Sequence, residues 1–475
     1  MIHRDAGTPF PLRVCIGPRT IRAVSRFKRV GAERIFSPKE SPRVCIGPRT
    51  IRAVSRFKRV GAERIFSPKE SPRSVLFIGF AMAGIMEMMQ WGDWRVTVAL
   101  VVVALVTLYF YLTSNMNYWS KRGFPQIPAS PIPIFGNTFK ILTGQANFTE
   151  MFDQLYKKAG DQPFVGFFQG SQPVLLVKDP ELIKRILIKD FHAFMDRGFK
   201  IEEDVDPFNA KGLSNLNGQR WKNMRARLSP TFTSGRMKAM FPLMYSCSDV
   251  LLNCIENEVK KNSGEVVMEM KDCLSCFSTD VIATCAFGIQ YVSWANVDLD
   301  DLAAQAMLFF AAGLETTSSL SSFVLFELSK SEEGKEIQRN LQEEVDSVMQ
   351  EDGGKITYAG LKRMQLLERV VNETLRIHPP AGVLSRIAVE NYKIPETDLT
   401  LEKNTMVFIP TQAMQNDEKF FPEPKKFNPD RFLNKENYNH FAYLPFGDGP
   451  RLCIGKGKIR FDAGPTGSGC TSLQV

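Results

Sequence analysis

The chain has 475 residues, of which 44% are hydrophobic and 23% are charged, and this suits a globular protein with one large core or two ordinary ones. The formal net charge of +9 arises in the first 73 residues, which hold 18 Lys/Arg against 5 Asp/Glu, whereas the rest of the chain holds 42 against 46. The nine cysteines follow no disulfide-scaffold spacing, which argues against a secreted disulfide-rich domain and suits a reducing compartment.

The chain opens with a perfect tandem copy, because residues 14–43 and 44–73 are identical. Two copies are too few to bury a shared core as a solenoid does. We therefore predict that segment 1–73 is disordered or not part of the native protein. The alternative is a basic arm that binds RNA, DNA or anionic lipid. Few aromatic residues and no folded module accompany the arm, so no nucleic-acid partner is expected.

Segment 74–122 carries a membrane signal. Residues 96–112 contain no charged side chain, and as a helix they span about 25 Å, close to the thickness of a bilayer core. Aromatic residues that suit the interfaces flank this stretch: Trp94, Tyr118 and Trp119. No small-residue cleavage site follows, which favours an uncleaved anchor over a signal peptide; a buried core helix is the other alternative. Lys121 and Arg122 would keep the body on the cytosolic side.

The remaining sequence predicts a mainly α-helical domain with a smaller β region. The strand predictions are a hairpin over 164–168 and 173–177, followed by strands over 386–390 and 405–410. Apolar periodicity and helix-start residues predict helices over 148–159, 180–189, 237–261, 266–287, 297–329, 332–350 and 361–378.

A cysteine near the end of the chain stands in a Gly/Pro-rich turn, Phe446-Gly-Asp-Gly-Pro-Arg-Leu-Cys453-Ile-Gly455. A lone cysteine is usually a small buried hydrophobic residue. Here the glycines let the backbone curl closely, and free N–H groups in such a turn steady a negatively charged sulfur. Together with Arg451, the turn suits a thiolate that faces a cofactor.

The longest predicted helix, 297–329, starts with an acidic turn and has an almost wholly apolar middle, as expected of a helix buried in a large core. Gly313, Glu315 and Thr316 interrupt the apolar run. A locally opened helix with an acid and a hydroxyl suits the relay of protons. The alternative is a surface acid beside a Ser/Thr-rich helix end.

Two other pairs of polar residues lie one helical turn apart. Trp221 and Arg225 share a helix face and can meet the same anionic group. Glu373 and Arg376 form an acid–base pair, which is usually a solvated surface bridge of little energy. Arg431, in a Pro-rich stretch downstream, could turn that pair into a buried network.

These motifs, in this order, resemble those of a microsomal cytochrome P-450 of the insect xenobiotic-metabolising type, a haem-thiolate monooxygenase. The likeness covers about residues 90 to 455. It rests on four motifs: Trp221-x-x-x-Arg225; Ala312-Gly-x-Glu-Thr-Thr317; Glu373-x-x-Arg376 with Arg431; and Phe446-x-x-Gly-x-Arg-x-Cys453-x-Gly.

The resemblance implies roles for individual residues. Cys453 would be the axial thiolate ligand of haem b, and Glu315 and Thr316 would deliver protons to bound oxygen. The residues expected to hold the haem are Trp221, Arg225, Arg386, Phe446, Arg451 and Cys453. The structural triad would be Glu373, Arg376 and Arg431, with His378 in a structural role. Four residues are expected to line the substrate pocket: Leu308, Phe309, Val383 and Leu384.

The resemblance also implies an activity: NADPH- and O2-dependent monooxygenation of lipophilic or foreign small molecules. Electrons would come from NADPH through an NADPH-cytochrome reductase, with cytochrome b5 as a further partner. The protein would lie in the endoplasmic reticulum membrane with its catalytic domain, 123–455, in the cytosol.

The sequence departs from the family pattern at two places. Only a few residues separate the helix ending near 290 from the one starting near 297, where the family has several helices that roof the pocket. Segment 456–475 is rich in Gly, Pro and Ser, where the family continues into a long apolar helix. We therefore expect these helices to be missing. The alternative function is accordingly a non-catalytic truncated variant, pseudogene product or faulty gene model that cannot hold haem.

Overall fold

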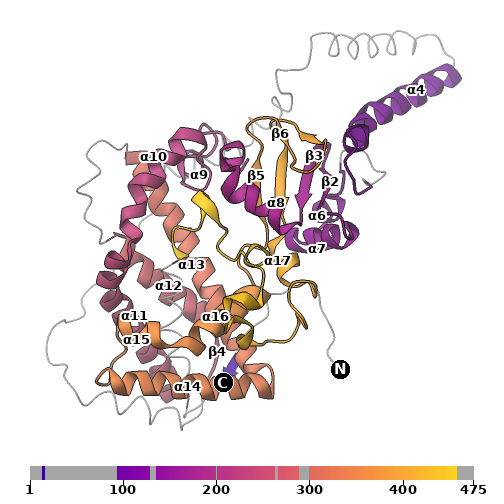
Figure 1. Ribbon diagram of the computed structural model, residues 1–475. Helices are drawn as coiled ribbons and strands as arrows, with labels where there is room; N and C mark the ends of the chain where they lie inside the picture. The colour runs from indigo at the N-terminus through magenta and orange to yellow at the C-terminus, as the bar shows by residue number, and fades with distance from the viewer. Residues whose placement is uncertain are drawn as a thin grey trace. The chain divides into compact units, whose positions relative to one another are not determined.

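The computed structural model describes residues 13–15, 94–128, 135–198, 201–262, 266–287 and 299–456 (Figure 1). The chain divides into two compact units, one formed by Met1–Lys28 with Asn115–Val475 and the other by Arg29–Ser114. Apart from residues 13–15, the repeat segment 1–73 lies outside the described residues, as do 288–298 and 457–475. The predictions about missing helices and about the tail therefore concern segments that the structure does not describe.

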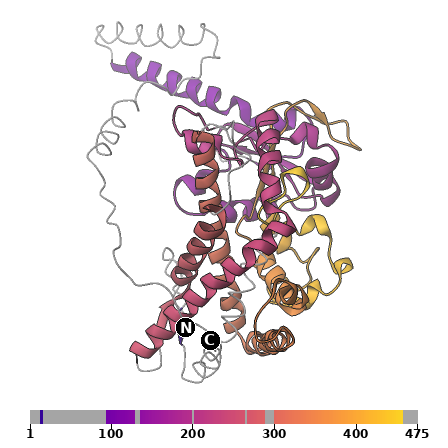
Figure 2. The same ribbon diagram turned by 90° about the vertical axis from the view of Figure 1, so that its left-hand side faces the viewer.

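The body is mainly helical with a small sheet region, as predicted. Its helices of eight or more residues are α7 (Phe148–Lys158), α10 (Gly218–Leu228), α11 (Ser234–Lys261), α12 (Met270–Phe287), α13 (Leu299–Ser329), α14 (Glu332–Glu351) and α16 (Gln365–Ile377). The shorter α-helices are α5 (Tyr118–Lys121), α6 (Phe139–Leu142), α8 (Pro180–Lys184), α9 (Pro207–Lys211), α15 (Tyr358–Arg363) and α17 (Thr411–Gln415). Figure 2 faces the helical side of the body.

A four-stranded sheet forms the other side of the core. Its order is β2 (Phe164–Gln169), β3 (Gln172–Val177), β8 (Met406–Ile409) and β5 (Leu384–Ile387). The predicted hairpin is confirmed as the antiparallel pair β2–β3, and β8 runs parallel to β3 and antiparallel to β5. Two small antiparallel pairs complete the strands: β6 (Tyr392–Lys393) with β7 (Thr400–Leu401), and β1 (Arg13–Cys15) with β4 (Val267–Glu269).

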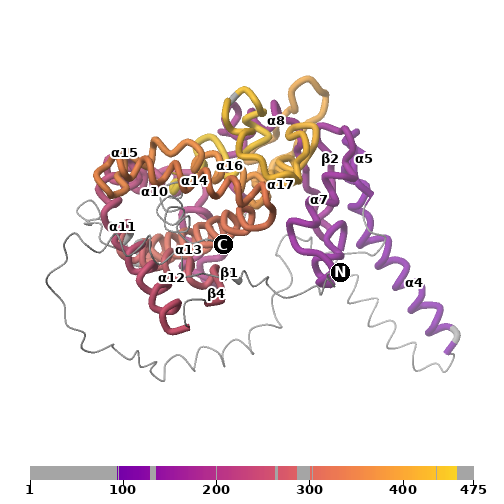
Figure 3. Tube along the Cα trace, turned by 90° about the horizontal axis from the view of Figure 1, so that it is seen from below, coloured from indigo at the N-terminus to yellow at the C-terminus, as the bar shows by residue number. Residues whose placement is uncertain are grey.

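Helix α13 is the central element of the helical side. It packs against α12 along much of its length and also contacts α16 and α14 (Figures 1 and 3). Asp300 and Asp301 stand in its first turn, where carboxylates are stabilised by the helix dipole. Its second half is buried, with Leu320 and Leu325 at most 2% exposed. The buried face of this half is mixed, because polar residues are buried beside the leucines: Thr317, Ser318, Ser321, Ser322 and Glu327.

Several predicted elements differ in their ends. Residues 267–269 at the start of the predicted helix 266–287 form strand β4, so that α12 begins only at Met270. The predicted helix 361–378 is two helices, because Met364 leaves helical geometry (φ −73°, ψ 84°) between α15 and α16. The predicted helix 180–189 consists of α8 followed by a π-helical turn, Arg185–Lys189. Local periodicity does not encode these breaks.

In the other unit, α4 (Trp94–Thr113) is a helix of 20 residues. By length and composition two described stretches are apolar enough to span a membrane: Val96–Lys121, whose most apolar window has mean hydropathy 2.3 and no buried residue, and Ala303–Ser329, whose most apolar window has mean hydropathy 1.3. Trp119, expected at a membrane interface, is instead buried in the body at 1% exposure. The second stretch belongs to α13 of the body. The predicted span 96–112 falls inside the first stretch and is helical.

Candidate active site

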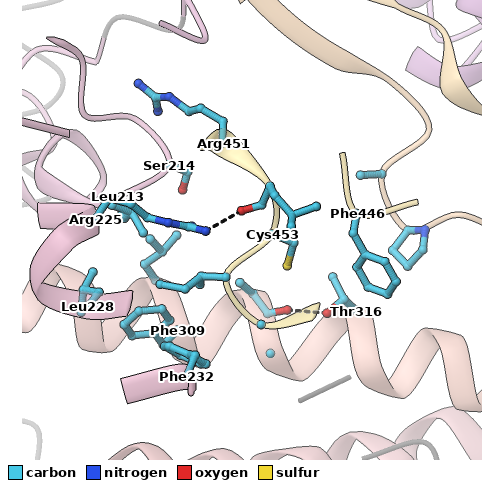
Figure 4. A pocket seen from close by; sticks show the side chains of 18 of the residues that line it. Leu213, Ser214, Arg225, Leu228, Phe232, Phe309, Thr316, Phe446, Arg451 and Cys453 are labelled. Carbon is cyan, nitrogen blue, oxygen red and sulfur yellow. Dashed lines mark hydrogen bonds between the residues drawn. The ribbon is translucent and has the colours of Figure 1, made fainter. Parts of the chain in front are cut away.

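A cavity of about 570 Å³ lies between α10, α13, the Cys453 loop and the segment that leads into β5 (Figure 4). Most of its lining is apolar. All four residues predicted to line a substrate pocket do border it: Leu308, Phe309, Val383 and Leu384. Trp221, Arg225, Thr316, Arg386, Phe446, Arg451 and Cys453 border the same cavity. The structure therefore brings together residues that lie more than 200 positions apart in the sequence.

The Cys453 loop is shaped by glycines. Gly449 has φ +71°, and an added Cβ would lie 1.9 Å from the carbonyl oxygen of Leu187, so that no other residue fits without a backbone shift. The Asp448 side chain accepts the Gly449 N–H at 2.7 Å, and the Cys453 N–H donates to the Phe446 carbonyl oxygen at 2.9 Å. These bonds close the turn. Figure 4 shows the sulfur of Cys453 directed toward α13.

Four arginines border the cavity: Arg197, Arg225, Arg386 and Arg451. Arg451 is 4% exposed, lies 4.2 Å from the ring centre of Trp221, and donates to the carbonyl oxygens of Met195 and Leu216 at 2.8 Å. Arg225 donates to the Leu452 carbonyl oxygen at 2.9 Å (Figure 4). The guanidinium groups thus fix the loop that carries Cys453 and border the cavity at the same time.

The arginine cluster carries more positive charge than its described neighbours balance. Burial, together with the charges of Arg197 and Arg451, lowers the pKa of Arg386 to about 9. Burial and the charge of Arg197 lower the pKa of Arg451 to about 9, although Asp196, at 3.4 Å, acts in the opposite direction. Among the described residues, Arg386 Nε and Arg451 Nη1 are buried without a hydrogen-bond partner. Orphaned cationic donors of this kind fit a ligand that brings carboxylates.

The surroundings of Cys453 suit a sulfur that binds a metal ion. Burial raises the pKa of Cys453, while the Gly455 N–H and the charges of Arg197 and Arg225 favour the thiolate. A coordinated metal ion deprotonates a thiol outright. With the apolar cavity in front of the sulfur, and the unsatisfied donor atoms of Arg386 and Arg451 at the same site, the chemistry of the site fits haem, which offers an iron and two carboxylates.

Helix α13 passes the cavity at Gly313 and Thr316, both of which border it. A Cβ at Gly313 would lie 2.3 Å from Ile282 of α12, so the glycine allows α12 and α13 to approach closely. The Thr316 hydroxyl donates to the Ala312 carbonyl oxygen at 2.6 Å. The predicted local opening of this helix is absent, because α13 stays α-helical from Leu299 to Ser329.

Glu315 does not belong to the lining of the cavity. Its carboxylate is exposed and accepts hydrogen bonds from Lys271 at 2.6 Å and from the hydroxyl of Ser319 at 3.2 Å. Adjacent positions on a helix point about 100° apart, so Glu315 and Thr316 face different surroundings. The structure therefore places the predicted hydroxyl in the cavity and the predicted acid beside α12.

The pair Glu373–Arg376 is buried rather than solvated. Both residues are 0% exposed, and Arg376 binds the Glu373 carboxylate through Nε at 2.8 Å and Nη2 at 2.9 Å. Arg431 Nε lies 3.4 Å from Glu373 Oε1. Arg376 also donates to the carbonyl oxygens of Gln415 and Pro424. The network ties α16 to the irregular chain that precedes the Cys453 loop.

His378, predicted to be structural, connects two helices. Its Nε2 lies 2.8 Å from Oε1 of the buried Glu327 in α13, and its ring stacks on Phe323 at 4.2 Å between ring centres. Sequence reasoning missed Arg197 and Gln305, which also border the cavity. The only local signal for Arg197 was Gly198, which adopts φ +86° directly after it.

Comparison with known proteins agrees with this geometry. The family model described as Cytochrome P450 matches residues 125–296 and 292–457. The chain is 34% identical over 455 residues to cytochrome P450 6j1 of Blattella germanica, covering 78% of this chain and 89% of that protein. It is 32% identical over 476 residues to cytochrome P450 9e2 of the same species, covering 76% and 88%.

A relative from a second insect gives the same result. Cytochrome P450 6a2 of Drosophila melanogaster is 32% identical over 453 residues, which cover 74% of this chain and 88% of the relative. Matches of this extent and identity, along the whole of the body, leave no other family to consider. The chain belongs to the cytochrome P450 family of monooxygenases.

Proposed function

We propose that the chain is an NADPH- and O2-dependent monooxygenase of lipophilic, xenobiotic-type small molecules that works with a haem ligated by Cys453. The observation that carries this proposal is that Cys453 and four arginines all border one apolar cavity. A thiolate ligand and a set of unpaired cationic donors serve different parts of the same cofactor. Either feature alone would be weaker support.

In this proposal Cys453 would hold the iron, and Arg225, Arg386 and Arg451 would hold the haem carboxylates together with Trp221. Arg197, which lies in the irregular segment before α9, would join this set. Phe446 borders the cavity beside the cysteine turn. When bound, the haem would supply oxygen activation, which a thiolate ligand favours. The protein supplies the position, the charge and the exclusion of water.

Two hydroxyls of α13, those of Thr316 and Thr317, border the cavity and can hold a proton there; Thr316 is the one proposed for this role. Its bond to the Ala312 carbonyl oxygen orients the hydroxyl and leaves the oxygen lone pairs free to accept a further hydrogen bond. Glu315 is proposed as the acid that replenishes this proton. Because Glu315 is paired with Lys271, a change of its side-chain rotamer is required before it can act.

Lipophilic substrates are favoured by the lining. Leu308 and Phe309 of α13, Val383 before β5 and Leu384 at its start offer apolar surface. Cavities of this kind bind ligands through apolar burial with a few polar contacts. These four residues are therefore proposed as substrate-contacting positions. The lining supports a class of substrate rather than a single compound.

The proposed cellular setting follows from α4. Segment 74–122 would anchor the chain in the endoplasmic reticulum membrane through residues 96–112, with Lys121 and Arg122 on the cytosolic side. The domain 123–455 would then meet the membrane-bound NADPH-cytochrome reductase, its electron donor, and cytochrome b5. Lipophilic substrates would reach it from the bilayer.

The non-catalytic alternative is less well supported. It requires that the chain cannot hold haem, yet the cavity, the arginine cluster and the Glu373–Arg376 network form within the described residues. Turnover decides between the two. The full chain, reconstituted in phospholipid vesicles with the reductase, should convert 7-ethoxycoumarin only when NADPH is present. Cys453→Ala, which keeps the turn but removes the sulfur, is the matched control; equal turnover by both proteins would refute the proposal.

A further inference from the structure

One wall of the cavity has no long helix or sheet of its own. It consists of the short segment 211–216, which begins at the last residue of α9 (Pro207–Lys211). Leu213, Ser214 and Asn215 of this segment border the cavity. Such a short irregular segment keeps a defined position only if its backbone groups are bound to something rigid.

Gln305 of α13 binds this wall. Its side chain is 2% exposed, its Oε1 accepts the N–H of Leu213 at 2.9 Å, and its Nε2 donates to the carbonyl oxygen of Lys211 at 2.7 Å. Nε2 also lies 3.3 Å from the Asp301 carbonyl oxygen in its own helix. The last carbonyl groups of a helix have no partner within it, and Gln305 supplies that partner to α9 from a distant part of the chain.

The chemistry of this contact requires a glutamine. The Leu213 N–H needs an acceptor and the Lys211 carbonyl oxygen needs a donor, and one side-chain amide provides both. Because both amide atoms are engaged by the wall, they are not offered to a ligand, although Gln305 borders the cavity. A buried backbone group that loses its partner costs much more than an exposed one.

The other end of the wall is held separately. The carbonyl oxygen of Leu216 accepts a hydrogen bond from Arg451 at 2.8 Å, so the end nearest Cys453 is fixed by the arginine cluster. Lys211 lies 3.7 Å from Asp300 and 3.9 Å from Asp301 in the first turn of α13, which adds a weaker, salt-sensitive attraction. Loss of Gln305 would therefore loosen one end of the wall and leave the cofactor end in place.

We propose that Gln305 is a positioning residue that sets ligand selectivity by holding the wall 211–216 at a fixed place beside the cavity. This inference rests on the proposed haem-dependent function, because the ligands in question are those that bind in front of the haem. Gln305 touches the wall and acts on the ligand through it. The wall in turn decides how far a ligand larger than the iron-binding group can extend.

Two substitutions test the hydrogen bonds between Gln305 and the wall. Gln305→Leu removes both hydrogen bonds at similar size. Gln305→Glu keeps an acceptor for the Leu213 N–H but sets a carboxylate oxygen against the Lys211 carbonyl oxygen. Both variants should therefore loosen the wall, and Gln305→Leu is the cleaner test because it buries no added charge. Ser322→Ala is the matched control, because Ser322 is also buried in α13 but its hydroxyl bonds only to Ser318 of the same helix.

The first experiment uses the haem-loaded full chain and two probes that bind iron through nitrogen, imidazole and 4-phenylimidazole, followed by the shift of the Soret band. Imidazole is too small to depend on the wall. We expect Gln305→Leu to raise the Kd of 4-phenylimidazole by about tenfold and that of imidazole by less than about twofold, with haem content unchanged. Equal changes for both probes, or none, would overturn the proposal.

The second experiment does not require haem. Hydrogen–deuterium exchange of the full chain should accelerate in peptides covering 207–216 in Gln305→Leu and stay unchanged in peptides covering β8. The Ser322→Ala control should change neither. Unchanged exchange in 207–216 would contradict the proposal. If the wild-type chain takes up no haem, the proposed function fails, while this experiment still decides whether Gln305 holds the wall.

Discussion

Arg376 and Glu373 form a two-pronged ion pair, with bonds of 2.8 Å and 2.9 Å, in which neither side chain has any exposed surface. A pair of this kind is expensive to bury and very expensive to break, because the remaining partner is left as an uncompensated charge. The pair therefore fixes one arrangement of α16 against the chain that leads to Cys453.

The first prediction concerns this pair. Glu373→Gln should lower the free energy of unfolding by about 3–5 kcal/mol, since it leaves Arg376 buried without its counter-ion. Lys335→Ala breaks a pair of similar length with Glu332 on the surface of α14 and should cost at most about 1 kcal/mol. Urea unfolding followed by circular dichroism measures both. Similar losses for the two variants would show that burial does not matter here.

The second prediction concerns the turn around Cys453. Gly449→Ala and Gly353→Ala both place a side chain at positive φ, +71° and +74°, but only Gly449 faces a backbone oxygen, whereas nothing lies within 4 Å of a Cβ at Gly353. Conformational strain alone should cost about 1–2 kcal/mol at either site.

The clash at Gly449 should add about 1–3 kcal/mol and reduce haem content, whereas Gly353→Ala should leave haem content unchanged. Melting temperature and haem absorbance per chain measure the two effects. The turn would be more adaptable than its geometry implies if Gly449→Ala bound haem as fully as Gly353→Ala does.

The third prediction is that one substitution, Arg386→Met, stabilises the haem-free protein but weakens haem binding. Arg386 is 2% exposed, and burial with the neighbouring arginines lowers its pKa to about 9, so the charged form is destabilised in the folded protein without an anion. Arg386→Met should therefore raise the melting temperature of the haem-free protein. The same substitution should weaken haem binding by about tenfold or more, because a charged hydrogen bond to the cofactor is lost.

Arg220→Met serves as the comparison, because Arg220 is 60% exposed and pairs with Glu203 away from the cavity lining. Arg220→Met should change neither the melting temperature of the haem-free chain nor the affinity for haem. Melting curves of the haem-free chain and haem titrations give both readouts. A fall of stability and of haem affinity together in Arg386→Met would mean that the arginine is structural rather than held for an anion.

The fourth prediction concerns pH. Burial raises the pKa of Glu327, but the hydrogen bond from His378 and the charge of Lys330 outweigh burial, so that the pKa lies below its usual value. A carboxyl group with a lowered pKa in the folded state stabilises the fold above its unfolded pKa of about 4.3. This contribution is lost as the pH falls through the lower pKa of the folded state.

Glu327→Gln should therefore melt at a lower temperature than wild type at pH 7, and the difference should shrink as the pH falls below about 4. Thermal melts of both proteins across this range provide the measurement. A difference that stayed constant with pH would show that the ionised form of Glu327 contributes nothing.

The sequence predicted the parts of the site that are defined locally. Trp221 with Arg225, and Glu373 with Arg376, lie one turn apart on a helix, and helical periodicity alone places each pair on one face. The glycines of the Cys453 turn are partly local, because Gly447 and Gly449 adopt positive φ, but Gly449 also faces the distant carbonyl oxygen of Leu187. In the structure Glu373 binds Arg376, and Trp221 and Arg225 both border the cavity.

The parts that sequence reasoning missed depend on distant contacts. Gln305 binds Leu213 across 92 positions of sequence, and nothing in the apolar run around it marks a capping role. Arg197 lies in an irregular segment with no period to interpret. The partner of Glu315 is Lys271 of α12, which depends on how two helices cross. Such contacts depend on how distant helices and loops pack together, which the local sequence pattern does not reveal.

The central claim is that Cys453 holds a haem in the cavity. The reduced carbon-monoxide difference spectrum of the full chain in membranes tests it most directly, with Cys453→His as the matched variant. The account predicts a thiolate-type Soret band for the wild type and a band of the nitrogen-ligand type, at shorter wavelength, for the variant. No haem uptake by the wild type, or a thiolate-type band that persists in Cys453→His, would contradict the account.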